Sequence, residues 1–531
     1  MNKQRVYLYD STLRDGSQMR GVDFTVSDKI AIAKALDEFG IDYIEGGWPG
    51  ANPRDDAFFD EPPILHHAKL TAFGMTRRAG ASASNDPTLA ALLNQGAQHL
   101  CLVGKTWDFH IHTALGISED ENEAMIYDSI AHMVQHGKYT MFDAEHFFDG
   151  FKQNKQVALR MIQAAYRAGA QWVVLCDTNG GTLPHEIYDI VREVGEVIPA
   201  EKLGIHCHND TGNAGANSLA AVLAGARHVQ GTINGIGERC GNADLITLIP
   251  NLMLKMQMDV GVSEESLAHL VTLSRMVDER LDRTPNLHAP YVGMAAFAHK
   301  GGLHVSAMAK STKSYEHIPP ESVGNKREII ISDKAGRSNI VSRLKDFGMV
   351  IADDDPRIAE VVRIVKQRET QGYSYEAAPA SFELLAHRML QQRDDHFSMI
   401  SFRVLDERRW NARGELVTLS EATIKLLIGQ EKIMVVDEGN GPVNALDGAL
   451  RKALIPNFPI LSQMRLTDYK VRIISSSDAT AAVTRVVIES MDHLGNRWST
   501  VGVSPNVIDA SYNALHDAIH YMLLLHPSSV S

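Results

Sequence analysis

The sequence contains few cysteines, no long apolar run and no strongly basic segment. Its 531 residues include 4 cysteines, widely spaced in apolar segments, so we expect reduced thiols in a reducing compartment. No stretch of about 18 apolar residues exists to span a bilayer. A formal net charge of −13 argues against a nucleic-acid partner, because such partners require a cationic surface. With no signal peptide recognisable at the N-terminus, these absences predict a cytoplasmic protein without membrane or nucleic-acid partners.

The composition is that of a folded protein with more than one domain. Hydrophobic residues make up 44% and charged residues 22%, so global disorder is not expected. A chain of this length is too long for one ordinary core, and two or three domains are expected. The residue patterns change twice, which predicts domains at 1–260, 261–380 and 381–531.

The first segment alternates short strand-like runs with longer helical patterns. Eight such units are typical of a (β/α)8 TIM barrel, and an open doubly wound sheet is the main alternative. Polar clusters after several of the strands favour the barrel, whose active sites lie at the carboxyl ends of the strands. The expected strands are Val6–Tyr9, Tyr43–Glu45, Lys69–Phe73, His99–Val103, Tyr139–Ala144, Trp172–Cys176, Leu203–Cys207 and His228–Ile233.

The remaining segments predict a mostly helical linker and an α+β domain. Helices are expected at Glu264–Leu281, Arg337–Phe347 and Pro356–Glu369, separated by loops that could cover a neighbouring site. The last segment indicates an approximate duplicate of two β-β-β-α halves. Its expected strands are Met399–Leu405, Glu415–Ile428, Lys432–Glu438, Lys470–Ile474 and Ala481–Glu489, with helices at Val443–Ala453 and Val507–Leu524.

The stretch around His206 and His208 predicts a metal site. If Leu203–Cys207 is a strand, its two-residue period points both imidazoles the same way. Asp15 follows the first strand and Asn242 the eighth, and in a closed barrel the first, seventh and eighth strands are neighbours. A lone histidine on an apolar strand is more often a satisfied core residue, but this convergence favours a metal. The donors suit Mn²⁺, Mg²⁺, Co²⁺ or Zn²⁺.

Other polar residues at strand ends are candidates for catalysis. Arg14, beside Asp15, is more simply a surface ion pair, but next to a metal ligand it could donate to an oxygen that gains negative charge. Glu145 after the fifth strand and Thr178 after the sixth point to the same end of the barrel. Glu145 taken alone could be a structural carboxylate, but its position favours a functional role.

Three stretches resemble the signatures of the α-isopropylmalate, homocitrate and citramalate synthases, a family of metal-dependent, Claisen-condensing TIM barrels. They are Asp10-Ser-Thr-Leu-Arg-Asp-Gly16, His206-Cys-His-Asn-Asp210 and Gly235-Ile-Gly-Glu-Arg-Cys-Gly-Asn242. Gly439-Asn-Gly-Pro-Val443 and the helix after it resemble the regulatory domain of these synthases. The stretches Tyr43–Gly50, Asp143–Gly150, Cys176–Thr182 and Val229–Gly235 are most similar to the citramalate synthase subgroup.

This resemblance implies condensation of acetyl-CoA with a 2-oxo acid, followed by thioester hydrolysis. It implies that His304, with Tyr315 and Glu145 in support, lies near the acetyl proton, and that Arg14 and the metal hold the developing oxyanion. Thr178 would bind substrate. His304 and Tyr315 lie in the linker, and they would be supplied in cis or by a partner subunit.

Within the family, the subgroup implies pyruvate as the 2-oxo acid and citramalate as the product, on the 2-oxobutanoate route to isoleucine. Met75, Leu102 and Trp107 are candidate walls for a pocket that accepts only a methyl group. Isopropylmalate or homocitrate synthase activity is the first alternative, and an acyl-CoA lyase of the same superfamily the second. The third alternative is a non-catalytic protein that senses an amino acid. The presence of all four predicted metal ligands argues against it.

The C-terminal domain is expected to be regulatory, with isoleucine as the end-product effector. The alternative is a module that serves dimerisation only. In either case we expect a homodimer or a higher homo-oligomer.

Overall fold

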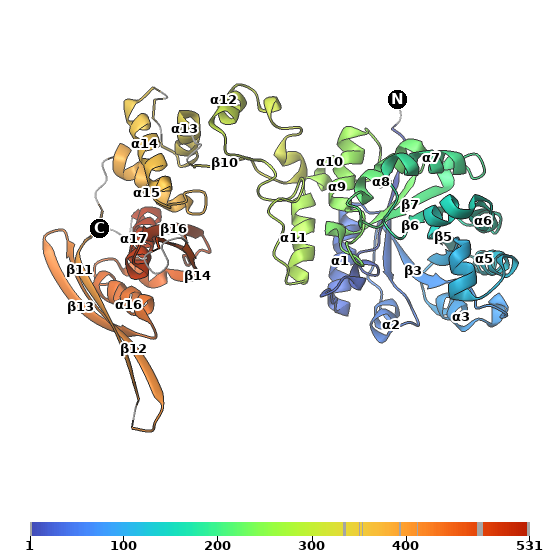
Figure 1. The fold of residues 1–531 in the computed structure, drawn as a ribbon, viewed down its shortest axis with the longest axis horizontal. Helices are drawn as coiled ribbons and strands as arrows, with labels where there is room; N and C mark the ends of the chain where they lie inside the picture. Colours follow the sequence, from blue (N-terminus) through green and yellow to red (C-terminus); the bar gives the residue numbers. More distant parts are fainter. Residues whose placement is uncertain are drawn as a thin grey trace. The chain divides into compact units, whose positions relative to one another are not determined.

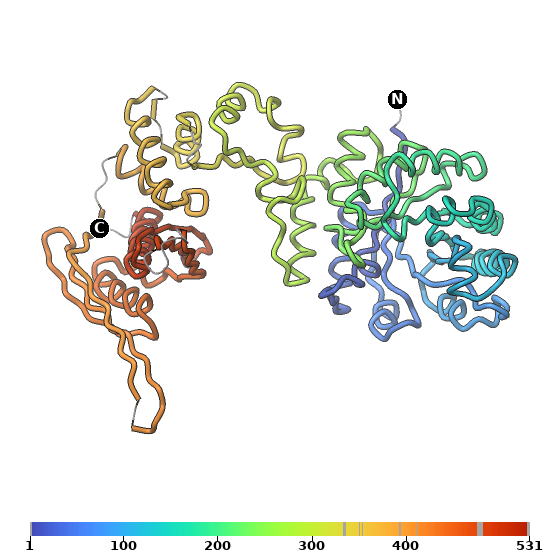
Figure 2. Tube along the Cα trace, viewed as in Figure 1, coloured from blue at the N-terminus to red at the C-terminus, as the bar shows by residue number. Residues whose placement is uncertain are grey.

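The computed structural model describes residues 3–332, 336–349, 351–352, 354–391, 395–410, 412–474 and 482–527. Contacts divide the chain into two compact units, coloured mainly blue to green and yellow to red in Figures 1 and 2. The first unit comprises Met1–Phe297 and Ile318–Lys326, and the second Ala298–His317 and Arg327–Ser531. Segment Ile318–Lys326 belongs with the first unit because Asn325 Nδ2 donates to the carbonyls of Tyr291 and Gly293.

The first unit contains a closed barrel of eight parallel strands. The first strand pairs with the eighth, Tyr7 opposite His228 and Asp10 opposite Gly231, which closes the sheet. This confirms the predicted TIM barrel, and the open doubly wound sheet was wrong. The strands are β1 (Tyr7–Asp10), β2 (Tyr43–Gly47), β3 (Lys69–Met75), β4 (His99–Lys105), β5 (Tyr139–Glu145), β6 (Val173–Asp177), β7 (Leu203–Cys207) and β8 (His228–Gly231).

Helices surround this barrel (Figure 1). The first of them, α1, is capped at Thr25, whose hydroxyl accepts the Asp28 N–H, and ends at Gly40 with φ of 104°, a left-handed conformation that glycine adopts readily. The helices are α1 (Val26–Phe39), α2 (Pro53–Asp60), α3 (Pro87–Asn94), α4 (Asp108–His110), α5 (Glu119–Gln135), α6 (Phe147–Arg167), α7 (Pro184–Val194), α8 (Ala214–Ala224), α9 (Leu245–Pro250), α10 (Glu264–Leu267) and α11 (Leu270–Arg280).

The two faces of the barrel strands form separate cores. In β4, Leu100 and Leu102 pack into the large cluster with the helices, whereas Cys101 belongs to an aromatic-rich cluster with Tyr9 and Trp172. The two-residue period of a strand produces this division. Leu102 therefore faces the helices, and the suggestion that it lines a substrate wall was wrong.

The second unit begins with the helical linker. A short parallel pair, β9 (Ala298–His299) and β10 (Glu328–Ile329), holds the segment together. Its helices are α12 (Gly302–Lys310), α13 (Arg337–Asp346), α14 (Pro356–Thr370) and α15 (Pro379–Leu390). The helix expected at Glu264–Leu281 is two helices, α10 and α11, and both lie in the first unit.

The C-terminal part consists of two sheets, each followed by a helix, which confirms the two β-β-β-α halves. Both sheets are antiparallel, with the strands in sequential order. The strand expected to start at Ala481 begins at Thr484, and Ala481 itself lies outside the described residues. The elements are β11 (Ser398–Trp410), β12 (Leu416–Ile428), β13 (Glu431–Gly439), α16 (Pro442–Leu454), β14 (Arg465–Ile473), β15 (Thr484–Met491), β16 (Arg497–Ser504) and α17 (Val507–Leu525).

Two composition-based expectations can be compared with this structure. All four cysteines are free, three of them buried and Cys240 exposed. Among the described residues, no helix combines the length and the apolar character needed to cross a bilayer.

Candidate active site

The four predicted ligands converge at the carboxyl ends of β1, β7 and β8. The Nε2 atoms of His206 and His208 are 3.3 Å apart, and Asp15 Oδ2 lies 3.6 Å from the first and 3.9 Å from the second. Asn242 pairs through its backbone with His208 and donates its Nδ2 to Asp15 Oδ1 at 3.0 Å. Donors that share one ion at about 2.0–2.2 Å have separations of this size.

A cation fits the donors that these side chains present. Both hydrogens of the Asn242 amide are used, toward Asp15 and the Ile236 carbonyl. The buried Asn242 Oδ1 has no hydrogen-bond partner among the described residues. A buried carbonyl oxygen without a partner is costly, and it is a suitable metal ligand beside two imidazoles and a carboxylate.

The protonation states of the cluster suit ligation. Burial would raise the pKa of Asp15, but the charges of Arg14, His206 and His208 outweigh it and lower the pKa to about 2. Burial and the neighbouring His206 lower the pKa of His208 to about 4. At neutral pH the site therefore offers a carboxylate and a neutral imidazole, the forms that bind metals.

Two buried residues that the motif analysis missed orient His206. Its Nδ1 lies 2.8 Å from Gln230 Oε1, and Gln230 Nε2 donates to Asp143 Oδ1 at 3.0 Å. The amide oxygen of Gln230 accepts only, so it fixes the proton on Nδ1 and leaves Nε2 as the ligand atom. The strand period could have identified them, because Gln230 follows His228 by two positions in β8 and Asp143 precedes Glu145 by two in β5.

Arg14 is held rigidly beside the cluster. Its Nε donates to Glu45 Oε2 at 2.7 Å, and its Nη1 lies 3.5 Å from Asp15 Oδ2. Tyr9 donates to the other Glu45 oxygen at 2.8 Å, and the guanidinium carbon lies 4.0 Å from the centre of the Phe73 ring. Burial lowers the pKa of Arg14, but Glu45 and Asp15 raise it overall, so the guanidinium stays charged. Glu45, which fixes this charge, was also missed.

Glu145 lies at the rim of a hollow at the ends of β3, β4 and β5. The hollow has a volume of about 530 Å³ and is lined by Trp48, Met75 and Lys105 among others. Glu145 forms an ion pair with Lys105. Met75 lines this hollow, whereas the Trp107 indole donates to Gln153 Oε1 at 2.6 Å; the suggestion that either residue bounds the 2-oxo acid pocket stays a prediction.

Thr178 connects the loops after β5 and β6. Its Oγ1 accepts the backbone N–H of His146 at 2.8 Å, and its carbonyl accepts from the Arg239 guanidinium at 2.7 Å. Arg239 is held in turn by Asp210. The Thr178 hydroxyl is therefore fixed in position.

His304 and Tyr315 belong to the second unit and lie against each other. Their rings stack with centroids 4.1 Å apart and planes inclined by 25°. His304 lies on the exposed face of α12, and Tyr315 is 44% exposed. The pair therefore presents an accessible imidazole beside a phenol.

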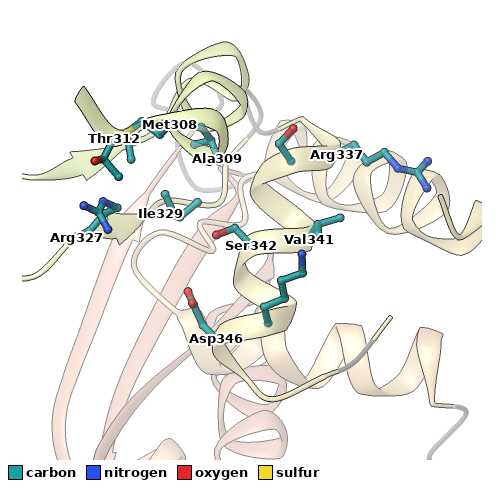
Figure 3. Close-up of a pocket in the computed structure, with 12 residues that line it drawn as sticks. Met308, Ala309, Thr312, Arg327, Ile329, Arg337, Val341, Ser342 and Asp346 are labelled. Carbon is teal, nitrogen blue, oxygen red and sulfur yellow. The ribbon is translucent and has the colours of Figure 1, made fainter. Parts of the chain in front are cut away.

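A second hollow lies behind the other face of α12, within the second unit (Figure 3). It has a volume of about 530 Å³ and lies among α12, β10 and α13. Val305 and Met308 pack there against Ile329, and Arg327 donates to Glu316. This packing fixes α12 with His304 turned outward.

Comparison with known families identifies all three parts of the chain. Residues 5–277 match the HMGL-like family, residues 291–372 the homocitrate synthase post-HMGL domain-like family, and residues 376–523 the LeuA allosteric (dimerisation) domain.

Full-length relatives narrow the assignment. The chain is 51% identical over 524 residues to the (R)-citramalate synthase of Aquifex aeolicus, covering 98% of both chains. It is 49% identical to the (R)-citramalate synthase of Geobacter sulfurreducens, covering 98% of this chain and 97% of the relative. A probable 2-isopropylmalate synthase of Methanopyrus kandleri is 30% identical, with 96% and 97% covered. The chain therefore belongs to the HMGL-like family of barrel enzymes, and within it to the group of the (R)-citramalate synthases.

Proposed function

We propose that the protein condenses acetyl-CoA with pyruvate and water to give citramalate and CoA, in the branch of isoleucine biosynthesis that passes through 2-oxobutanoate. The observation that carries the proposal is 51% identity over 98% of both chains to an (R)-citramalate synthase. Relatives with 2-isopropylmalate synthase names are more distant, at 30% and 29% over the full length. Hence pyruvate is preferred over 2-oxoisovalerate or 2-oxoglutarate as substrate.

The metal is a single divalent ion. Asp15, His206, His208 and Asn242 would hold it, and it would act there as a Lewis acid toward the ketone of the 2-oxo acid. Arg14 places a fixed positive charge beside this cluster, where the former ketone oxygen gains negative charge. The Thr178 hydroxyl, which accepts from the backbone, has its own hydrogen to donate to the substrate carboxylate.

The carbon–carbon bond requires removal of a proton from the acetyl methyl group. In this proposal His304 takes that proton, with Tyr315 and Glu145 in support. The resulting carbanion attacks the ketone carbon, a new C–C bond forms, and the oxygen takes up a proton. Water then hydrolyses the thioester and CoA leaves. The stacked, outward-facing His304 and Tyr315 support these roles.

The first test compares His208→Ala with His185→Ala, which changes an exposed histidine on α7. Removing the ligand should abolish CoA release from acetyl-CoA plus pyruvate, and the control should retain it. Circular dichroism checks that both variants are folded. Full activity in His208→Ala would disprove the proposed site.

The second test measures CoA release with pyruvate, 2-oxoisovalerate and 2-oxoglutarate. Each additional methylene in a tight pocket costs roughly 1–3 kcal/mol, so pyruvate should have the highest kcat/KM. Faster turnover of 2-oxoisovalerate would favour isopropylmalate synthase activity. Cleavage of a 3-hydroxy-3-methyl acyl-CoA without condensation would favour a lyase.

The C-terminal part supports a regulatory role. The match to the LeuA allosteric (dimerisation) domain supports a homodimer that binds isoleucine as inhibitor, with residues 1–260, 261–380 and 381–531 as catalytic, linker and regulatory parts. A cytoplasmic location completes the proposal, supported by four free thiols. Isoleucine should lower CoA release and light scattering should give twice the chain mass; no response to isoleucine would leave dimerisation as the role of the domain.

Removing the C-terminal domain is not a suitable test of this regulation, because the truncation would disrupt contacts within the domain's own fold. A chain ending near residue 385 would cut α15, whose Ser381 hydroxyl donates to Asp517 and accepts the Val501 N–H. Gly439, at the end of β13, lies close to the helix that follows it, because a Cβ there would lie 2.5 Å from the Ala445 nitrogen. Inhibition is therefore better measured on the full chain.

A further inference from the structure

A second cluster of metal-ligating side chains lies in the second unit. Asp395 precedes β11, and His516 and His520 are four residues apart on α17, a spacing that places both on one helix face. One carboxylate oxygen and two imidazole nitrogens lie within 4.8 Å of one another. The proposed reaction uses none of these residues.

Both imidazoles turn one nitrogen toward Asp395. The Nδ1 of His520 lies 2.8 Å from the His516 carbonyl oxygen, and the Nδ1 of His516 lies 3.9 Å from Asp517 Oδ1. Both Nε2 atoms face Asp395, each 3.8 Å from one of its oxygens. His520 thus directs its second nitrogen to a carbonyl, as metal-bound histidines typically do, whereas the second nitrogen of His516 is beyond hydrogen-bond distance of Asp517.

The separations are those of ligands around an ion and not those of hydrogen bonds. At 3.8 Å, neither histidine is within hydrogen-bond distance of Asp395. In the same unit, the simple pair of His526 and Asp492 closes to 3.2 Å. In the barrel cluster the distances are similar to those of the second cluster: the carboxylate oxygen of Asp15 lies 3.6 and 3.9 Å from the Nε2 atoms of its two histidines. The carboxylate–imidazole separations of the second cluster are therefore similar to those of the first.

His520 supplies an independent indication. Its side chain is 3% exposed, and its buried Nε2 has no hydrogen-bond partner among the described residues. The ring is fixed by stacking on Phe397, with centroids 4.5 Å apart. The His520 Nε2 therefore remains a buried polar atom without a hydrogen bond among the described residues. A bound cation would satisfy it.

The local charge also suits a cation. Arg388 donates to Asp395 Oδ1 at 2.8 Å and to Asp517 Oδ1 at 3.0 Å. One guanidinium is thus shared by two carboxylates, which leaves one negative charge uncompensated among these three groups. Asp395 Oδ2 faces His516, so it can bind an ion while Oδ1 keeps its hydrogen bond.

We propose that Asp395, His516 and His520 bind a divalent transition-metal ion, separate from that of the barrel. Two imidazoles and one carboxylate are a ligand set for Zn²⁺ or Co²⁺, whereas Mg²⁺ and Ca²⁺ prefer oxygen ligands only. Asp395 is exposed, so water can complete the coordination. The ion would link the segment before β11 to α17, two parts of the proposed regulatory domain.

The test uses the full chain and separates the two sites. In a His206→Ala/His208→Ala variant, equilibrium dialysis against Zn²⁺ followed by mass spectrometry of the metal should still find one ion per chain. Adding His516→Gln should weaken that binding about 100-fold or more, since the loss of an outer-shell partner alone costs up to about that factor. The unchanged protein should bind two. No ion in the folded double variant would overturn the proposal.

Two controls keep the result specific. His526→Gln removes a histidine of the same helix region that is paired with Asp492, and it should leave Zn²⁺ binding unchanged. Asp395→Asn, at an exposed position, should weaken binding without disturbing the fold, which circular dichroism verifies. Co²⁺ should give visible absorption that disappears in His516→Gln. Unchanged Zn²⁺ binding in both His516→Gln and Asp395→Asn would refute the site.

Discussion

Glu45→Gln tests how Arg14 is held beside the metal cluster. The Glu45 carboxylate is 0% exposed and is bonded to Arg14 at 2.7 Å and to Tyr9 at 2.8 Å. Two charges about 4 Å apart attract by about 4 kcal/mol at an effective dielectric constant of about 20. Removing one partner of a buried pair costs about 3–5 kcal/mol, because the other charge stays buried without compensation. We therefore expect the barrel to lose about 4 kcal/mol of stability, together with CoA release.

The assay is urea unfolding followed by tryptophan fluorescence. Replacing Trp410 and Trp498 by phenylalanine in every arm confines the signal to the first unit. Asp23→Asn is the matched control, because its ion pair with Arg54 is exposed and exposed pairs are worth about 0–1 kcal/mol. A Glu45→Gln barrel within about 1 kcal/mol of the control would refute the reasoning.

Three further changes have defined outcomes. Gln230→Leu should weaken metal binding at the barrel about 10–100-fold in equilibrium dialysis, because it removes the acceptor that orients His206; unchanged affinity would contradict this. Burial would raise the pKa of Asp492, but the hydrogen bonds it accepts lower it to about 2. The stability that these hydrogen bonds contribute is therefore complete above the ordinary pKa near 3.8 and is lost as the pH falls toward 2. Urea unfolding between about pH 5 and pH 3, followed by the fluorescence of Trp498 in the same unit, should therefore show a smaller loss of stability in Asp492→Asn than in the unchanged chain; equal losses would exclude this role. Gly46→Ala would place a Cβ 2.4 Å from the Phe58 ring. It should lower the free energy of unfolding of the first unit by about 1–3 kcal/mol in the fluorescence assay used for Glu45→Gln, and an unchanged stability would show that the ring can move.

The barrel and the convergence of the four candidate ligands could be predicted because short-range patterns indicate them. His206 and His208 share a face by the period of β7, and closure of the barrel brings Asp15 and Asn242 to them. Glu45, Asp143 and Gln230 follow the same strand period and lie in stretches that resemble the citramalate synthases, but nothing in those stretches distinguishes a single buried polar residue from its neighbours. Their importance appears only when Arg14 and His206 are seen to depend on them.

Other features depend on contacts between distant segments. The spacing of apolar residues from Glu264 to Leu281 predicts one continuous helix, yet the first helix ends at Leu267 and the next begins at Leu270. Gly324 approaches so closely there that a Cβ would lie 2.1 Å from the Ala268 carbonyl oxygen. β16 (Arg497–Ser504) was not identified as a strand, and β14 begins five residues earlier than expected. Both strands are defined by pairing with β15, which the local sequence does not show.

Pairing of β1 with β8 also has a consequence for the newly made chain. Asp15 is synthesised 191 residues before His206, an interval of roughly 10 to 40 s on the ribosome at about 5–20 residues per second. Throughout that interval the first strand has at most one of its two neighbours, and no nascent fragment contains all four candidate ligands. Metal uptake by the barrel therefore reports that the last strand has docked, and a chelator added during synthesis should not slow the steps that precede closure.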